Sequence, residues 1–443
     1  APSLAMVCPM LTRALRERGS ETKKKAAQIV ASMVELMREP KDFLPYYPAI
    51  IPHLKGTLVD PIPDVRQVAA KAFGRIAGAL GEEHLDDVLP WLFTTLKSSS
   101  SSVERSGAAN GLSEVLVALG AEKLDEFLPL ILENAANKKS APEVREGYLG
   151  LFVYLPIAFG ESFQMYVPQV LPALLRGLAD ESEPVRDVSF RAAEVLVGQY
   201  GATHTALLLP PLEEGIFSPD WRIRQASVSL LGTLITRILR PMDAPPSADG
   251  ALQPTQDLMA SEVLSRERRA FLLSSLYIVR SDDNLVVRST AGSVWKSVVS
   301  NTPKTLKELL PILMKRLIQN LGSESREKQT VAGRCVGDLV QKLGDRVLPD
   351  LMPIFAQTLE SSEWHTRRGV CIGLGEVIEA APKALLAEYS QVLLPTVRKV
   401  LCDTEGRVRE TATHCAAKLY EKNSPLVLEQ VLPWLMDQLF SPP

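Results

Sequence analysis

Apolar residues recur along most of the chain at the three- and four-residue spacing of an amphipathic helix. Residues 65–80 show this most clearly, because their apolar positions share one helical face while Arg66 and Lys71 fall on the other. The preceding segment 60–64, Asp-Pro-Ile-Pro-Asp, has prolines that cannot continue an earlier helix and an aspartate suited to cap a later one. The pattern predicts two helices joined by a short turn.

This helical pattern returns about every 40 residues. An arginine opens the second helix of each unit, and successive arginines are 38 to 42 residues apart except for one step of 64. The arginines are Arg66, Arg105, Arg145, Arg186, Arg224, Arg288, Arg326, Arg367 and Arg409. A proline in an apolar setting stands about 15 residues before most of them. Repetition at this period is typical of paired-helix solenoids.

We therefore predict an all-α fold, an α-solenoid of about ten to eleven helical pairs in which each pair buries its neighbour's apolar face. The long step indicates a Pro-rich insertion at 240–265, expected to form a flexible loop that the surface tolerates rather than a binding segment. The expected domains are 1–239 with six repeats, this insertion, and 266–443 with four repeats and a final half repeat. Because the helix at 426–440 lacks a partner and the chain starts on Ala, we expect a segment of a longer protein.

Composition limits the function classes. A net charge of −3 and a pI near 6.1 give no general attraction to nucleic acid or anionic membranes, so any such binding needs a local patch. Five cysteines without a Cys-x-x-Cys pair fit a reducing compartment. The longest nearly apolar stretch, 148–159, is too short to cross a bilayer. We expect a cytoplasmic protein without a membrane partner.

Enzymatic chemistry has one weak signal. Residues 333–337, Gly-Arg-Cys-Val-Gly, match a nucleophile elbow, but that motif needs a strand-turn-helix context and here Cys335 lies within an apolar helical pattern. The five histidines are scattered without metal-ligand spacing, and no phosphate-binding loop occurs. The sequence predicts no enzyme and no catalytic, cofactor or metal site.

Four units carry an aspartate six residues before the recurring arginine. An acid in the turn and an arginine early in the second helix can bond each other or the neighbouring unit, which would form a structural ladder of charges along the stack. Its expected members are Asp60 and Arg66, Asp180 and Arg186, Asp282 and Arg288, and Asp403 and Arg409.

The first unit carries a basic cluster around its turn. Six cations stand against Glu17 and Glu21 alone, a local charge of six minus two, or +4. Such side chains would project from one edge of the stack, where they could meet RNA phosphates or form a solvated helix face, and both interpretations stay open. The candidate ribosome or RNA contacts are Arg13, Arg16, Arg18, Lys23, Lys24 and Lys25.

Several strings resemble one family, the very large HEAT-repeat translational activator of the general amino-acid control kinase (the general control non-derepressible family). They are Asp-Pro-Ile-Pro-Asp-Val-Arg at 60–66, Arg-Ser-Gly-Ala-Ala-Asn-Gly-Leu at 105–112, Trp-Arg-Ile-Arg at 221–224, Val-Trp-Lys-Ser-Val-Val-Ser-Asn-Thr-Pro at 294–303 and Gly-Val-Cys-Ile-Gly-Leu at 369–374. The first units also resemble the HEAT segment of fungal elongation factor three, at Lys-Lys-Ala-Ala-Gln-Ile-Val, 24–30.

This resemblance implies a non-enzymatic scaffold that binds ribosomes through ribosomal proteins and rRNA. It implies help in activating the kinase that phosphorylates the alpha subunit of initiation factor two during amino-acid starvation or ribosome collision, with the kinase held beyond Pro443 and a HEAT- or ABC-type co-activator as a further partner. Two other HEAT scaffolds are alternatives. A nuclear transport receptor is usually more acidic, and a phosphatase scaffold lacks the insertion and the strings above.

Overall fold

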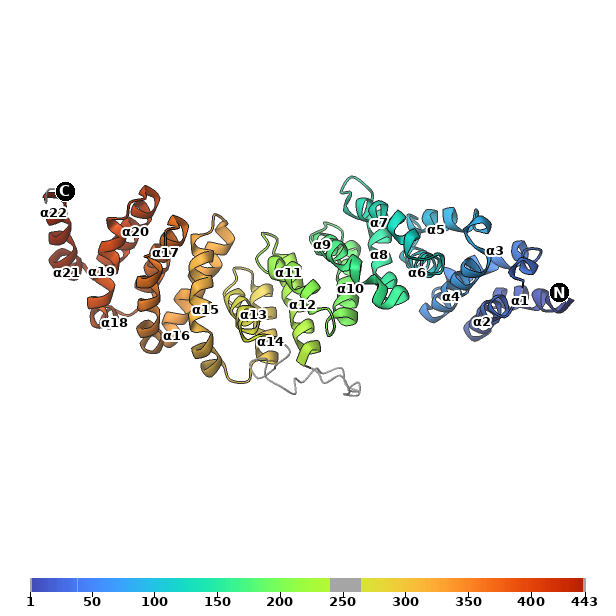
Figure 1. Cartoon of the computed structure of the whole chain (residues 1–443), viewed down its shortest axis with the longest axis horizontal. Coiled ribbons are helices and arrows are strands. Elements are labelled where there is room, and N and C mark those ends of the chain that lie inside the picture. The colour runs from blue at the N-terminus through green and yellow to red at the C-terminus, as the bar shows by residue number, and fades with distance from the viewer. Residues whose placement is uncertain (1, 38, 240–263, 441–443) are drawn as a thin grey trace. The chain divides into compact units, whose positions relative to one another are not determined.

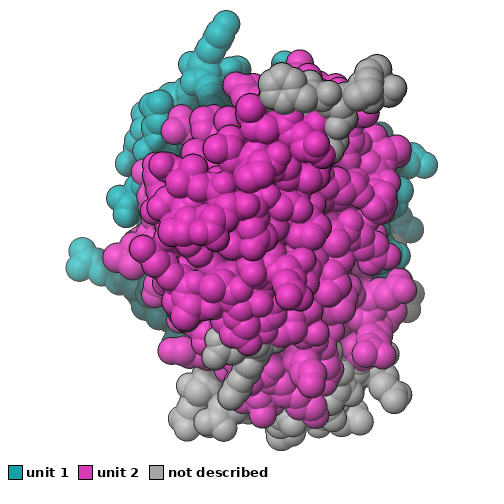
Figure 2. All heavy atoms as spheres, turned by 90° about the vertical axis from the view of Figure 1, so that its left-hand side faces the viewer, with its two compact units in different colours: residues 1–211 teal, residues 212–443 magenta. Residues whose placement is uncertain are grey.

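The computed structural model describes residues 2–37, 39–239 and 264–440. Within those ranges every regular element is helical and no strand occurs, which confirms the all-α prediction. The expected insertion at 240–265 lies outside the described residues up to position 263. The chain separates into two compact units, residues 1–211 and 212–443, which Figure 2 colours separately. The three-part division expected from the sequence stays a prediction.

Unit 1 consists of helix pairs, each with a first (A) and a second (B) helix (Figure 1). Every B helix packs against the B helix of the next pair. The A helices are α1 (Pro2–Arg16), α3 (Tyr47–Leu58), α5 (Val88–Leu96), α7 (Ala121–Ala136) and α9 (Val167–Gly177). The B helices are α2 (Ser20–Glu35), α4 (Pro63–Leu80), α6 (Ser102–Leu119), α8 (Pro142–Phe159) and α10 (Glu183–Tyr200). Short 3-10 turns, η1 (Pro40–Phe43), η2 (Glu82–His84) and η3 (Gly160–Tyr166), precede α3, α5 and α9, and α11 (Thr205–Gly215) crosses the unit boundary.

Unit 2 continues the pairing. Its elements are α12 (Trp221–Leu239), α13 (Arg266–Val279), α14 (Leu285–Val298), α15 (Thr302–Gly322), α16 (Arg326–Thr358), α17 (Trp364–Ala380), α18 (Lys383–Glu388), α19 (Ser390–Leu401), α20 (Gly406–Lys422), α21 (Ser424–Leu426), a π turn η5 (Val427–Val431) and α22 (Leu432–Phe440). The backbone of α16 leaves helical geometry at Leu343 (φ −136°, ψ 17°), so α16 joins the B helix of one pair to the A helix of the next. The single helix expected at 426–440 is interrupted by the π turn.

The sequence markers have direct structural causes. In α4 the predicted apolar face is buried, with Val65, Phe73 and Ile76 at most 1% exposed. Pro63 stands in the first turn of α4, where its missing N–H needs no helical partner. The recurring apolar prolines lie inside A helices, as Pro52 does in α3, and this confirms the predicted order of the two helices.

Successive helical pairs approach closely because glycines of B helices contact the A helix of the preceding pair. A Cβ added at Gly107 of α6 would lie 2.1 Å from the carbonyl oxygen of Leu58 in α3. One at Gly147 of α8 would lie 1.9 Å from the carbonyl oxygen of Leu96 in α5. Both distances are far inside van der Waals contact, so these glycines set the spacing between pairs.

Among the described residues, no helix combines the length and the apolar composition needed to span a bilayer.

Candidate functional site

The aspartates of the predicted ladder close their own turns. The Oδ1 atoms of Asp60, Asp180, Asp282 and Asp403 accept the backbone N–H two residues later at 3.0, 2.9, 2.8 and 2.9 Å. The arginine six residues on does not meet the carboxylate. Arg66, Arg186, Arg288 and Arg409 instead donate Nη1 to the backbone carbonyl of that aspartate at 2.9, 2.8, 2.6 and 2.7 Å.

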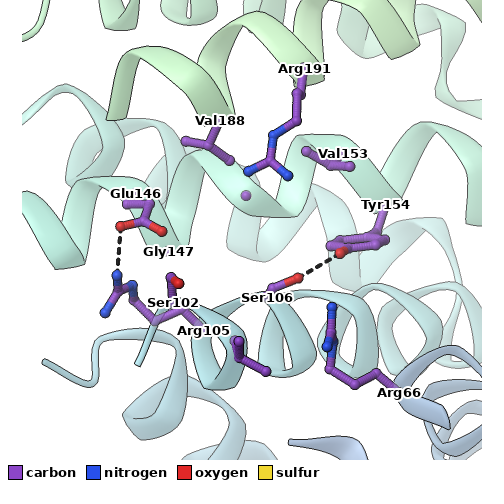
Figure 3. Close-up of a pocket in the computed structure, with 12 residues that line it drawn as sticks. Arg66, Ser102, Arg105, Ser106, Glu146, Gly147, Val153, Tyr154, Val188 and Arg191 are labelled. Carbon is purple, nitrogen blue, oxygen red and sulfur yellow. Dashed lines mark hydrogen bonds and ion pairs between the residues drawn. The ribbon is translucent and has the colours of Figure 1, made fainter. Parts of the chain in front are cut away.

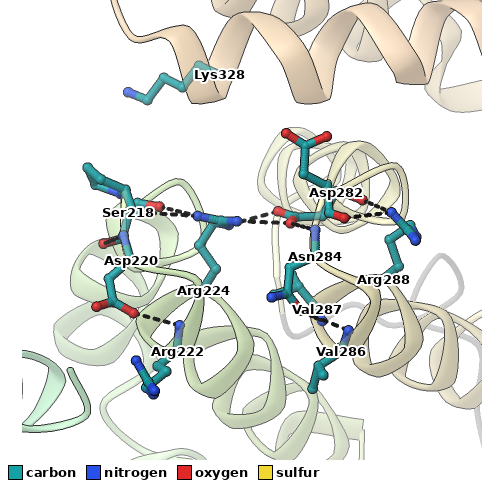
Figure 4. A network of polar contacts seen from close by, with 12 residues as sticks. Ser218, Asp220, Arg222, Arg224, Asp282, Asn284, Val286, Val287, Arg288 and Lys328 are labelled. Atoms are coloured by element: carbon teal, nitrogen blue, oxygen red, sulfur yellow. Dashed lines mark hydrogen bonds and ion pairs between the residues drawn. The ribbon is translucent and has the colours of Figure 1, made fainter. Parts of the chain in front are cut away.

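Each of these carboxylates is held by a cation of the preceding pair. Arg145 contacts Asp180 at 2.8 and 2.9 Å, and Arg224 contacts Asp282 at the same two distances. Arg367 contacts Asp403 at 2.7 and 3.0 Å, and Lys23 contacts Asp60 at 2.6 Å. Figure 4 shows the run from Arg224 through Asp282 to Arg288. The ladder therefore uses backbone carbonyls within a helical pair and charged side chains between successive helical pairs.

Serine replaces the acid in the other turns. The carbonyl oxygens of Ser98, Ser218 and Ser361 accept from Arg105, Arg224 and Arg367, but a serine side chain offers no carboxylate to the preceding pair. The turn after the Arg105 pair also has a serine, Ser140, whose carbonyl oxygen accepts from Arg145, and Arg105 contacts Glu146 instead, at 2.6 Å. In the turn before α16 the donor to the Ser323 carbonyl is Gln329, at 2.6 Å, and not Arg326, which the repeat spacing had marked.

The pKa is lowered for three acids of the ladder, Asp60, Asp180 and Asp403. The guanidinium of Arg367 lowers the pKa of Asp403 against the opposing effect of burial, and the Glu405 N–H adds to it. Burial by itself would raise the pKa of Asp180, but hydrogen bonds from Arg145 and the Ser182 N–H outweigh it, so the result is lowered. These acids are therefore ionised at neutral pH. These ion pairs join successive helical pairs, so their role is to stabilise the stack and not to catalyse a reaction.

The basic cluster of the first pair divides into two sets. Lys23 is bound to Asp60, and Lys24 lies 2.5 Å from Glu21 and 4.0 Å from Asp64. The side chains of these two lysines are only 21% and 23% exposed. Both are therefore occupied by contacts inside the fold.

The other four cations face outward, and we call them the amino-terminal basic surface: Arg13, Arg16, Arg18 and Lys25. The side chain of Arg13 is 87% exposed, and its Nε lies 4.0 Å from the carboxylate of Glu17, too far for a hydrogen bond. Arg16 donates to Nε2 of His53 at 2.8 Å, and burial together with Arg16 lowers the pKa of His53, so the ring stays neutral and Arg16 keeps its charge. Arg18 and Lys25 are exposed, and within the described part of the chain neither forms a hydrogen bond or a close ion pair. Sequence reasoning missed this division because Asp60, which binds Lys23, and Asp64, the second acid near Lys24, lie 37 and 40 residues away along the chain.

The cysteine motif is not arranged for catalysis. Cys335 lies inside α16 with no exposed surface, and burial raises the pKa of its thiol to about 12. A buried neutral thiol is a poor nucleophile. Within the ranges that the structure describes, no group of three or more His, Cys, Asp and Glu side chains is placed to hold a metal.

Three family descriptions match consecutive parts of the chain. Residues 1–87 match "Elongation factor 3/GNC1 HEAT repeat", residues 105–242 match "EF3 N-terminal HEAT repeat", and residues 264–441 match "Stalled ribosome sensor GCN1-like, HEAT repeats". Together they account for nearly all the helical pairs described above.

Similar proteins cover nearly the whole chain. The human protein named "Stalled ribosome sensor GCN1" is 44% identical over 99% of this chain and 17% of its own length. Proteins named "eIF-2-alpha kinase activator GCN1" are 40% identical in Dictyostelium discoideum and 35% identical in Saccharomyces cerevisiae, each over 99% of this chain. The chain spans 17% of the first of these and 16% of the second.

Proposed function

The chain belongs to the GCN1-like family of HEAT-repeat proteins, and from that membership we propose that it is a non-enzymatic scaffold segment that binds ribosomes. In this role it contributes to activation of a kinase that phosphorylates the alpha subunit of translation initiation factor two. The observation that carries the proposal is 44% identity over 99% of the chain to a protein named as a stalled ribosome sensor. Nuclear transport and phosphatase scaffolding are not favoured by these relatives.

The amino-terminal basic surface is the proposed contact with rRNA. Arg13, Arg16, Arg18 and Lys25 carry four positive charges on exposed side chains around one turn. Cations placed against phosphates release counterions, so a few such contacts give useful and salt-sensitive affinity. The ladder supports this role because it connects neighbouring helical pairs and so holds the surface in place.

The kinase is proposed to bind outside residues 1–443, in keeping with the small fraction of its relatives that this chain spans. A HEAT- or ABC-type co-activator and ribosomal proteins are further proposed partners, and the cytoplasm is the proposed location. In this arrangement the present chain supplies the ribosome-binding part of a longer scaffold.

Cosedimentation with purified ribosomes tests the proposal. The informative variant is Arg18→Glu with Lys25→Glu, because both side chains are exposed and, among the described residues, neither forms a hydrogen bond or close ion pair that the substitution would break. Reversal of Lys23 would be ambiguous, since it would leave the buried carboxylate of Asp60 without its cation. We expect the double variant to bind roughly tenfold or more weakly at moderate salt.

The matched control is Lys138→Glu with Lys139→Glu, an equal change of charge at two exposed lysines after α7 in the same unit. It should bind like the wild type. Equal weakening by both double variants would indicate a general charge effect and remove the amino-terminal basic surface as the contact. Failure of the unmodified chain to sediment with ribosomes would refute the proposed function itself.

A further inference from the structure

A basic pocket opens on the B helices of unit 1, away from the amino-terminal basic surface. It has a volume of about 180 Å³ and takes its walls from α4, α6, α8 and α10 (Figure 3). Its polar lining consists chiefly of Arg66, Arg105, Glu146, Ser106, Tyr154 and Arg191. The three arginines and one glutamate give a formal charge of three minus one, or +2.

Two of these arginines have guanidinium N–H groups that form no hydrogen bond among the described residues. Arg191 of α10 is exposed, has no hydrogen bond or ion pair among the described residues, and points into the pocket (Figure 3). Arg66 of α4 uses only Nη1, which bonds the carbonyls of Asp60 and Pro61, so Nη2 and Nε are unoccupied. Arg66 is also a ladder arginine whose next turn carries a serine, Ser98, in place of an acid. Two guanidinium groups therefore reach the pocket from opposite walls.

The third arginine carries an unsatisfied buried donor. Arg105 is 7% exposed, its Nη2 bonds Glu146 and its Nη1 bonds the Ser98 carbonyl, but its Nε has no partner. A buried N–H without an acceptor is costly, and native structures rarely leave one. In another part of the lining, the hydroxyls of Ser106 and Tyr154 lie 2.7 Å apart, so one donates to the other and the second proton is available to a ligand (Figure 3).

We propose that this pocket binds a phosphate monoester, the phosphorylated serine or threonine side chain of a partner protein. A phosphate monoester carries about two negative charges at pH 7, which matches the +2 of the lining. Planar guanidinium groups bond phosphate oxygens in pairs. Val153 and Val188 supply an apolar wall for the carbon atoms that carry the phosphate.

The surroundings favour a single anionic group over a nucleic acid strand. Of the four wall helices, α4 is net basic, with three cations against one acid, or +2, whereas α6 has Glu104 and Glu114 against Arg105, a net charge of −1. The helix α8 has two acids against one arginine, and α10 has three acids against two, so each is also −1. A polyanion that ran from the pocket along α6, α8 or α10 would meet carboxylates, whereas one side chain can enter the pocket end-on.

The experiment titrates the full chain against N-acetyl-O-phosphoserine N-methylamide and follows the phosphorus NMR signal. We expect saturable binding that strengthens as the pH rises through about 6, where the second phosphate proton dissociates. Arg191→Gln should weaken binding about tenfold or more, because a charge-assisted bond is lost. Arg176→Gln, which changes an exposed arginine of the A helix α9, should leave binding unchanged.

A second variant, Arg66→Gln, should weaken binding similarly, with circular dichroism as the check that its turn is intact. Wild-type affinity in both variants would overturn the proposal. Equal affinity for N-acetylglutamate N-methylamide would overturn it in favour of an acidic peptide. Equal and pH-independent affinity for uridylyl-uridine, a phosphodiester, would overturn it in favour of RNA. None of these results bears on ribosome binding through Arg18 and Lys25.

Discussion

Asp282 is the most buried acid of the ladder, and its replacement by asparagine is the sharpest test of what the ladder does. The carboxylate has no exposed surface and receives two hydrogen bonds from Arg224, whose side chain is 9% exposed. It also accepts the Asn284 N–H at 2.8 Å. Asp282→Asn keeps the size of the side chain, removes its charge and turns an N–H₂ group toward Arg224 or Asn284.

The expected cost is large because the guanidinium of Arg224 would remain buried without a counterion. Removing one partner of a buried ion pair typically costs about 3–5 kcal/mol. For a unit of this size, 1 kcal/mol corresponds to a shift of about 2–4 °C in Tm, so the transition should fall by about 6–20 °C. Differential scanning calorimetry of the full chain measures that shift.

The neighbouring Asp283 is a matched control. Its carboxylate contacts Arg334 at 2.6 Å, but the two side chains are 49% and 51% exposed. An exposed pair contributes at most about 1 kcal/mol, so Asp283→Asn should hardly move the transition. Equal effects of the two substitutions would refute the reasoning, because Asp282 is buried and accepts three hydrogen bonds, whereas Asp283 is half exposed and has one contact. Adding Arg224→Gln to Asp282→Asn should recover part of the loss, because the unpaired charge is gone.

Three further predictions concern packing, pH and thiol access. Gly147→Ala should destabilise the chain by about 1–3 kcal/mol in denaturant unfolding, because the new methyl group meets the Leu96 carbonyl, whereas Gly150→Ala, with 3.7 Å of room, should be neutral or stabilising. The folded-state pKa of Asp403 is lowered, so the stability it contributes is complete above the unfolded pKa of about 3.9 and is lost as pH falls through the folded value; the Tm difference between wild type and Asp403→Asn should therefore shrink from pH 5 to pH 2.5, and a constant difference would contradict this. Cys402 is the exposed thiol and the other four are buried, so a thiol reagent should modify one cysteine per native chain, and rapid modification of two would contradict the packing.

The sequence predicted the helical pairs because their signals are local. The spacing of Val65, Phe73 and Ile76 and the proline in the first turn of α4 depend only on residues within one helix. The spacing of the arginines was less reliable for individual bonds, because Gln329, and not Arg326, donates to the carbonyl of Ser323. A fixed period locates a unit, but the bonding position within it depends on how each turn is built.

Contacts between successive helical pairs could not be predicted from the sequence. The sequence left open whether the ladder acids bond within one helical pair or between successive pairs. The outcome depends on distances in space, such as that between Arg145 of α8 and Asp180 in the turn after α9. The same holds for the basic cluster, where Asp60 removes Lys23 from the surface. The pocket of Arg66 and Arg191 joins residues 125 positions apart, and each arginine alone has an ordinary place on a polar helix face.

The central claim, ribosome binding through the amino-terminal basic surface, is tested most directly by the salt dependence of that binding. The association constant of the chain with purified ribosomes is measured between about 50 and 200 mM salt for the wild type and for Arg18→Gln with Lys25→Gln. If both side chains neutralise phosphates, log K should fall linearly with log salt, and the double variant should reduce the slope by about 1.4 to 1.8. An unchanged slope, or wild-type binding that does not respond to salt, would contradict the claim.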